Sequence, residues 1–224
     1  MKFLKKMRMN RIFNLPRYWS NREMKRFSHL FTGNIINVSG WKDADKEGSF
    51  YKDYFINAEE YHISNIHGEC GDESEKSIFI DLEKPLDKDL KGRFDVVFNH
   101  TTLEHIYDVK TAFNNICSLS KDIVILVVPF SQPVHYSKSG DWYDYWRFTP
   151  FSIKKMFENN GFELVYLSSN DNFAASIYLF CIATKNPEKW KNREKDFDKV
   201  QLEPSMGLKN MHKVIKLLLN FIGS

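Results

Sequence analysis

The sequence predicts an α/β fold built on a mostly parallel sheet with one reversed edge. Residues 94–99 and 123–130 are apolar runs of strand length that flank a helix-length segment, which is the pattern of a parallel βαβ unit buried on both faces. Residues 162–168 and 175–184 form two more strands joined by a short turn of Ser, Asn and Asp, so we expect them to be antiparallel. With 224 residues, 42% of them apolar, the chain is long enough to fill one substantial core.

Seven strands are predicted where β-branched or alternating apolar runs end at Gly, Pro or polar clusters. In order, they cover residues 34–40, 60–66, 77–82, 94–99, 123–130, 162–168 and 175–184. Two helices lie between them, because apolar residues recur at helical spacing after Asp108 and after Pro150. Asp108 and Thr149 are the expected N-caps, and Gly161 ends the second helix.

Composition divides the chain into a basic N-terminal segment at 1–33, a domain at 34–186, and a charged tail at 187–224. The tail ends in an amphipathic helical pattern, which could pack on its own domain, on a second copy in a homodimer, or on anionic lipid. Residues 1–26 carry nine Lys or Arg against one acid, and they are either solvated, packed on a partner, or in contact with an anionic surface. The middle of the chain is acidic overall, which argues against a nucleic-acid-binding core.

No apolar stretch reaches the length of a secretory signal or a membrane span. We therefore expect a cytoplasmic protein, either free or peripheral to the inner face of the membrane. The three cysteines, Cys70, Cys117 and Cys181, form no C-x-x-C pair. Two of them lie in apolar segments, so we expect buried free thiols in a reducing compartment.

Two groups of motifs resemble a known family. The run Phe-Asp-Val-Val at 94–97 is followed by Leu-Glu-His-Ile at 103–106, a helix, and Val-Val-Pro-Phe at 127–130. This order resembles class I S-adenosylmethionine-dependent methyltransferases, in the subgroup often found among surface-glycan genes. The segment Pro-x-His at 133–135, with Asp-Tyr-Trp-Arg-Phe-Thr-Pro at 144–150, is similar to a motif of the same subgroup.

The resemblance covers about residues 34–186 and implies a Rossmann-like seven-stranded, mostly parallel sheet with an antiparallel terminal hairpin and helices on both faces. It also implies that S-adenosyl-L-methionine lies across the carboxyl ends of the first four strands, and that the protein serves polysaccharide biosynthesis. The cofactor-binding residues implied are Asn37, Ser39, Gly40, Asn65, Asp81, Leu82 and Asn99. The first loop keeps one glycine and has Asn37 in the usual acidic position, so either the cofactor is held differently or the site is degenerate. Asp81 has the alternative role of a turn former at a strand end.

His100, at the tip of the fourth strand, and His135 are the candidate general bases, with Asp144 orienting one of them. We expect His105 to orient the loop by hydrogen bonds. The spacing of His100, Glu104 and His105 is not a recognised zinc pattern, so we expect no metal.

The aromatic insertion offers Trp142, Tyr145, Trp146 and Arg147 as a wall for a glycan or another small acceptor, because sugar faces stack on rings and Arg binds anionic groups. The alternative is a packed loop in which Arg147 pairs with a nearby Asp.

These observations predict a methyltransferase that acts on a glycan, a lipid-linked sugar or a related small acceptor. The alternative is a non-catalytic relative that keeps the fold as a binding or assembly module. A NAD-dependent oxidoreductase is disfavoured because the sequence has no G-x-G-x-x-G.

Overall fold

The computed structural model of the protein describes residues 7, 9–66, 77–138, 142–170, 175–191 and 199–200. Seven strands form one sheet in the order β3-β2-β1-β4-β5-β7-β6. They are β1 (Gly33–Val38), β2 (Ala58–Asn65), β3 (Ile78–Phe79), β4 (Phe94–His100), β5 (Ser120–Ser131), β6 (Glu163–Ser169) and β7 (Ile177–Thr184). Strands β1 to β5 pair in parallel, whereas β7 is antiparallel to both β5 and β6. The predicted fold class is confirmed: the sheet is Rossmann-like and ends in an antiparallel hairpin.

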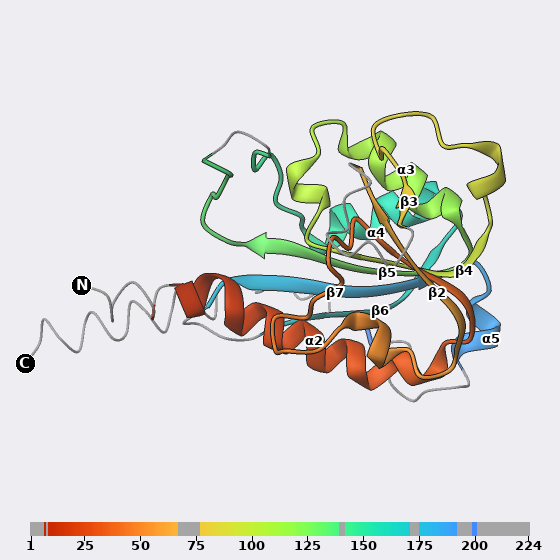
Figure 1. The fold of residues 1–224 in the computed structure, drawn as a ribbon, viewed down its shortest axis with the longest axis horizontal. Helices are drawn as coiled ribbons and strands as arrows, with labels where there is room; N and C mark the ends of the chain where they lie inside the picture. The colour runs from red at the N-terminus through yellow and green to blue at the C-terminus, as the bar shows by residue number, and fades with distance from the viewer. Residues whose placement is uncertain are drawn as a thin grey trace, which may run out of the picture.

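Helices cover the two faces of the sheet (Figure 1). Helices α3 (Val109–Leu119) and α4 (Pro150–Asn159) pack on one face, and α2 (Leu15–Phe27) packs on the other. A short helix, α5 (Pro187–Lys191), follows β7. Both predicted caps are present, since the Asp108 and Thr149 side chains accept hydrogen bonds from backbone N–H groups three residues ahead.

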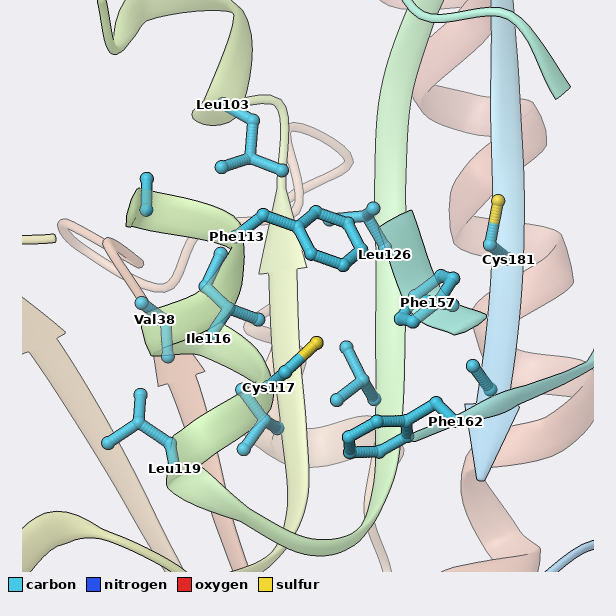
Figure 2. Packing of buried hydrophobic residues seen from close by; sticks show 14 of the residues in the cluster. Val38, Leu103, Phe113, Ile116, Cys117, Leu119, Leu126, Phe157, Phe162 and Cys181 are labelled. Carbon is cyan, nitrogen blue, oxygen red and sulfur yellow. The ribbon is translucent and has the colours of Figure 1, made fainter. Parts of the chain in front are cut away.

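The core on the α3 side is built from side chains that point from the helices onto β4 and β5. Figure 2 shows Phe113, Ile116 and Cys117 of α3 over these strands, with Phe157 from α4 beside them. All four are almost completely buried. Cys117 and Cys181 are free and buried, as the sequence predicted, and burial raises the pKa of each thiol. Cys70 lies outside the described residues.

The N-terminal segment forms the core on the opposite face. Met24 and Phe27 of α2 and the following Phe31 are buried against the sheet, and Phe31 contacts the ring of Trp190. The described part of 1–33 therefore packs as an integral layer, although its basic composition set it apart in the sequence. The predicted amphipathic helix beyond residue 204 lies outside the described residues.

The third strand is shorter than predicted, two residues instead of six. The chain turns at Asp81, whose carboxylate accepts a hydrogen bond from the backbone of Glu83. Ile80 and Leu82 are nevertheless buried, which explains why their apolar pattern resembled a longer strand. None of the described helices is long and apolar enough to cross a membrane.

Candidate functional site

A cavity of about 610 Å³ lies at the carboxyl ends of β1, β2 and β4, and we call it the Asp81 cavity. Ligands of open α/β sheets bind at this edge. Its walls combine rings, aliphatic side chains and a few polar groups, a composition typical of small-molecule sites. The lining residues are Ser39, Trp41, Asn65, Ile66, Ile80, Asp81, Leu82, Glu83, Thr101, Thr102, His105, Ile106 and Trp142.

Three of these lining residues have a left-handed backbone without being glycine: Ser39 (φ 57°), Trp41 (φ 46°) and Thr101 (φ 51°). A positive φ is costly for a β-branched residue such as Thr101, and strain of this kind gathers at functional sites. Hydrogen bonds hold the conformation, since the Thr101 N–H donates to the Val127 carbonyl at 2.8 Å. The cavity therefore lies between two loops whose shapes are fixed by the fold.

Asn65, one of the expected cofactor-binding residues, lines the Asp81 cavity, but its amide is hydrogen-bonded within the protein. Its Oδ1 accepts from the Trp41 N–H at 2.8 Å, and its Nδ2 donates to the Trp41 carbonyl at 3.3 Å. Asn65 therefore holds the strained turn after β1. Asp81 and Leu82 also line the cavity, and Asp81 forms the strand-end turn as well, so both of its predicted roles are compatible with this position.

A second cavity, of about 370 Å³, adjoins the first, and we call it the Arg17 cavity. Ser39, Trp41, Thr101 and Thr102 line both cavities. The other residues around it are Arg17, Asn37, Gly40, Lys42, Ala44, Lys46, Tyr51 and His100. Arg17 is not among the predicted site residues, because it lies in a segment whose composition resembles a basic extension. The spacing of the apolar Met24 and Phe27 was the available signal that this segment packs on a core.

Three predicted first-loop residues, Asn37, Ser39 and Gly40, line the Arg17 cavity, and two of them, Asn37 and Gly40, lie in close contact. The Asn37 amide donates to Asp43 at 2.6 Å, and both side chains are buried. A Cβ atom on Gly40 would lie 2.7 Å from Asn37 Cγ, so this position requires glycine. Asn99, by contrast, lines neither cavity and donates its amide to the Val38 carbonyl at 2.8 Å, tying β4 to β1.

His100 lines the Arg17 cavity, with both ring nitrogens in hydrogen bonds. Nε2 lies 2.8 Å from Ser20 Oγ and Nδ1 lies 3.2 Å from Thr101 Oγ1. Burial and then the nearby Arg17 guanidinium hold the pKa of His100 well below its ordinary value of 6.5. His100 is therefore a neutral ring fixed by its neighbours.

Of the predicted substrate wall, Trp142 lines the Asp81 cavity, and Tyr145, Trp146 and Arg147 line neither this cavity nor the Arg17 cavity. Trp146 donates its indole N–H to the Ile106 carbonyl at 2.9 Å, and the Tyr145 ring packs against Tyr107. These contacts attach the insertion to the loop after β4.

Arg147 forms a clamp inside the aromatic loop. Its guanidinium donates to both carboxylate oxygens of Asp144, and to the carbonyls of Gln132, Pro133 and Trp146. Burial, the largest single influence, acts to raise the pKa of the Asp144 carboxyl, but the hydrogen bonds and charge of Arg147, together with the hydrogen bond and charge of His135, leave that pKa lowered. These contacts favour the alternative in which Arg147 pairs with a nearby Asp.

His135 belongs to the same clamp and lines neither cavity. Its backbone N–H donates to Asp144 at 2.9 Å, and its Nδ1 lies 3.0 Å from the same carboxylate oxygen. The ring of His135 lies edge-on to His105, with the two centroids 5.0 Å apart.

Glu104 and His105 connect this clamp to the Asp81 cavity. Glu104 is 1% exposed, and neither carboxylate oxygen accepts a hydrogen bond from the described residues. Burial raises its pKa to about 8. His105 lines the cavity, with Nδ1 2.8 Å from the Tyr143 carbonyl and Nε2 3.8 Å from Glu104 Oε1. Because Nδ1 must donate to that carbonyl, Nε2 is the basic nitrogen of the neutral ring.

Within the described part of the chain, no group of three or more His, Cys, Asp or Glu is placed to hold a metal ion. No known family model matches the sequence, and no curated protein matches it.

The fold is similar to those of several solved methyltransferases. One is 1,6-didemethyltoxoflavin-N1-methyltransferase of Burkholderia thailandensis, with bound 1,6-didemethyltoxoflavin and S-adenosylhomocysteine (TM-score 0.53, 16% identity, 74% of this chain and 78% of that one). Magnesium protoporphyrin IX methyltransferase of Synechocystis, with bound S-adenosylhomocysteine, has TM-score 0.51 and 13% identity over 75% of this chain and 83% of the other. An S-adenosylmethionine-dependent methyltransferase of Clostridium acetobutylicum has TM-score 0.54 and 8% identity, covering 82% and 97%. At these identities the likeness establishes the methyltransferase Rossmann-like fold alone.

Proposed function

We propose that this protein is an S-adenosylmethionine-dependent methyltransferase that acts on a glycan, a lipid-linked sugar or a related small acceptor in polysaccharide biosynthesis. The observation that carries the proposal is the Asp81 cavity, which lies at the ligand-binding edge of this fold. The presence of S-adenosylhomocysteine in two proteins of similar fold supports the choice of cofactor.

The residues of the Asp81 cavity fit the adenosyl part of this cofactor. Ile80 and Leu82 offer an apolar surface to the adenine ring, and the Asp81 carboxylate is an acceptor for its amine. Trp41 and Trp142 add ring faces to the wall. When bound, the cofactor would supply an electrophilic methyl group for transfer to an acceptor oxygen. The loops after β1 and β4 border the cavity, so they can orient the cofactor and the acceptor toward each other.

The geometry supports His105 as the general base better than His100 or His135. His105 faces the Asp81 cavity with Nε2 unprotonated, whereas both nitrogens of His100 are engaged and His135 lines neither cavity. Nε2 would take the proton from the acceptor hydroxyl, with Glu104 as the neighbouring carboxyl. Nitrogen NMR of the ring tests this: we expect neutral His105 with the proton on Nδ1 at pH 7, and a proton on Nε2 would contradict the assignment.

Calorimetry with S-adenosylhomocysteine tests the cofactor. A hydrogen bond to a charged group contributes about 1.5–3 kcal/mol, so Asp81→Ala should weaken binding about tenfold or more. Asp89→Ala is the matched control, because Asp89 is exposed and lines neither cavity. Equal binding by the Asp81 and Asp89 variants would remove Asp81 from the site.

A non-catalytic binding or assembly module is the second candidate. It is favoured by the hydrogen bonds of two predicted cofactor-binding residues. The Asn37 amide bonds to Asp43 and the Asn65 amide bonds to the Trp41 backbone, so both amides are engaged within the protein. If the parent protein does not bind S-adenosylmethionine or its demethylated product at millimolar concentration, this candidate replaces the enzyme.

Peripheral contact with an anionic membrane through the basic ends, and homodimer formation, stay proposals that rest on composition. Exposed charges are screened over ~10 Å at 0.1 M salt, so membrane binding of this kind should fall steeply with salt. Flotation with phosphatidylglycerol vesicles measures it, and equal recovery with neutral vesicles would contradict it.

A further inference from the structure

We propose that the carboxyl end of the sheet carries a docking surface for an anionic membrane, which turns the two cavities toward the lipid. We call this surface the membrane patch. It consists of exposed apolar and basic side chains from the N-terminal segment and from the chain after β5: Met9, Arg11, Leu15, Val134, Tyr136 and Lys138. Composition gives contact through the basic ends no direction, whereas the contacts of the described residues give it one.

The first step is that the two segments of the membrane patch lie together. The Ile12 carbonyl accepts a hydrogen bond from the Gln132 amide at 3.5 Å, and the Phe13 ring lies edge-on to His135, with the centroids 5.3 Å apart. The N-terminal end of α2 and the arrowhead of β5 accordingly lie at the same end of the molecule (Figure 1). The membrane patch is therefore part of the end of the sheet that holds both cavities.

The second step is the chemistry of the exposed side chains. Val134 is 77% exposed, Tyr136 61% and Met9 46%. Residues 7–15 and 131–138 together carry three Lys or Arg and no Asp or Glu. Basic side chains beside exposed apolar ones are the combination that binds anionic lipid, because the charges attract the headgroups and the apolar groups enter the boundary with the acyl chains.

The third step is the aromatic insertion, which lies at the same end of the sheet. Four of its rings are 39–51% exposed: Trp142, Tyr143, Tyr145 and Trp146. All but Trp142 line neither cavity, so their exposed faces are available to a surface outside the cavities. Tyr and Trp are enriched where proteins meet the membrane–water interface, because each has an apolar ring and a polar group.

The opposite end of the sheet has the reverse charge. A cavity of about 310 Å³ there is lined by three acids, Glu59, Asp95 and Asp122, and by one cation, Lys189, among the described residues. An anionic surface repels this end and attracts the membrane patch, so charge orients the molecule with its cavities toward the lipid. This orientation suits the lipid-linked sugar among the proposed acceptors, a consequence that rests on the proposed function.

Flotation of the full chain with phosphatidylglycerol vesicles tests the surface. Arg11→Gln with Val134→Ser should weaken partition onto these vesicles about fivefold or more, because each Lys or Arg near an anionic surface contributes on the order of that factor. The matched control is Arg93→Gln with Ile56→Ser, which removes an exposed arginine and an exposed β-branched residue at the amino end of the sheet. The control should stay within about twofold of the parent protein, because neither change lies near the lipid.

Three results would overturn the proposal: equal effects of the two double variants, no flotation of the folded parent protein, or equal recovery with neutral phosphatidylcholine vesicles. Both double variants keep the basic ends of the chain, so a difference between them reports the membrane patch itself. Vesicle binding that depends on Val134 in a protein that binds no S-adenosylhomocysteine would defeat the proposed function and leave the docking surface standing.

Hydrogen exchange on the vesicle-bound protein tests the orientation. We expect slower amide exchange at residues 134–138 on binding, and unchanged exchange at residues 88–93, at the amino end of the sheet. Slower exchange at 88–93 alone, or at neither segment while the protein floats, would mean that lipid is bound without the membrane patch and would overturn the proposal. Slower exchange at 134–138 that appears without vesicles as the protein concentration rises would assign the patch to a second copy of the chain and would also overturn it.

Discussion

Arg147 and Arg17 both lie near the carboxyl ends of the central strands, since Arg147 bonds to Gln132 after β5 and Arg17 bonds to Thr101 after β4. The surroundings of the two arginines differ. Arg147 has its charge neutralised by Asp144, a carboxylate with no exposed surface, and donates to three carbonyls as well. Arg17 meets two hydroxyl groups and an open cavity. The contrast shows that an arginine in a conspicuous motif can be a structural element, while one in an apparent tail is available to a ligand.

Replacing each arginine by Gln should distinguish the structural role of Arg147 from the ligand-facing position of Arg17, because the two variants should lose different amounts of free energy of unfolding. Arg147→Gln leaves Asp144 buried without its partner, and breaking a buried ion pair in this way costs about 3–5 kcal/mol. Arg17→Gln leaves no carboxylate unpaired among the described residues, so we expect a change below about 1 kcal/mol. Denaturant unfolding measures both, and equal losses would mean that Arg17 is also a structural clamp.

Glu104 lies near both arginines and Asp144, and its ionisation should make stability depend on pH. Its pKa is raised from 4.5 to about 8 by burial, so the folded state keeps the proton after the unfolded state has lost it. The fold therefore has its full stability with respect to this group below pH 4.5, and that stability decreases as the pH rises toward 8.

Glu104→Gln removes this ionisation. The variant should be more stable than the parent protein by about 2 kcal/mol or more at pH 8, since each pKa unit corresponds to about 1.4 kcal/mol. The difference should shrink toward pH 4.5, where both side chains are neutral. Thermal unfolding across this range measures the gap, and a gap that does not vary with pH would mean that Glu104 is ionised in the fold.

Gly40→Ala tests the loop after β1, which lines the Arg17 cavity. The added Cβ would lie 2.7 Å from two side-chain atoms of Asn37, which is itself bonded to Asp43, so the loop must shift. Overpacking of this kind costs about 1–3 kcal/mol. We expect a matching loss of stability by chemical unfolding together with weaker binding of S-adenosylhomocysteine, because Gly40 is one of the predicted cofactor-binding residues. Unchanged affinity for S-adenosylhomocysteine would contradict a cofactor-binding role of this loop.

The sequence by itself determined the seven strands of the sheet and the N-terminal ends of α3 and α4, although it made the third strand too long and did not predict α2. An apolar run of strand length that is bounded by Gly, Pro or polar residues indicates a buried strand, and the caps Asp108 and Thr149 act within one turn of their helices, so both signals are local. A local signal also predicted the approximate position of the site, because strand ends can be recognised from polar residues that follow apolar runs.

Tertiary structure alone decided which side chains face the cavities. Asn65 and Asn99 occupy the predicted strand ends. The amide of each is hydrogen-bonded to a backbone segment that is close in space but distant in sequence. Arg17 reaches Thr101 across 84 positions, and no local pattern encodes that contact. Hydrogen-bond partners that far apart are fixed by packing of the whole domain, because the free energy of each contact depends on burial and on which groups remain unpaired.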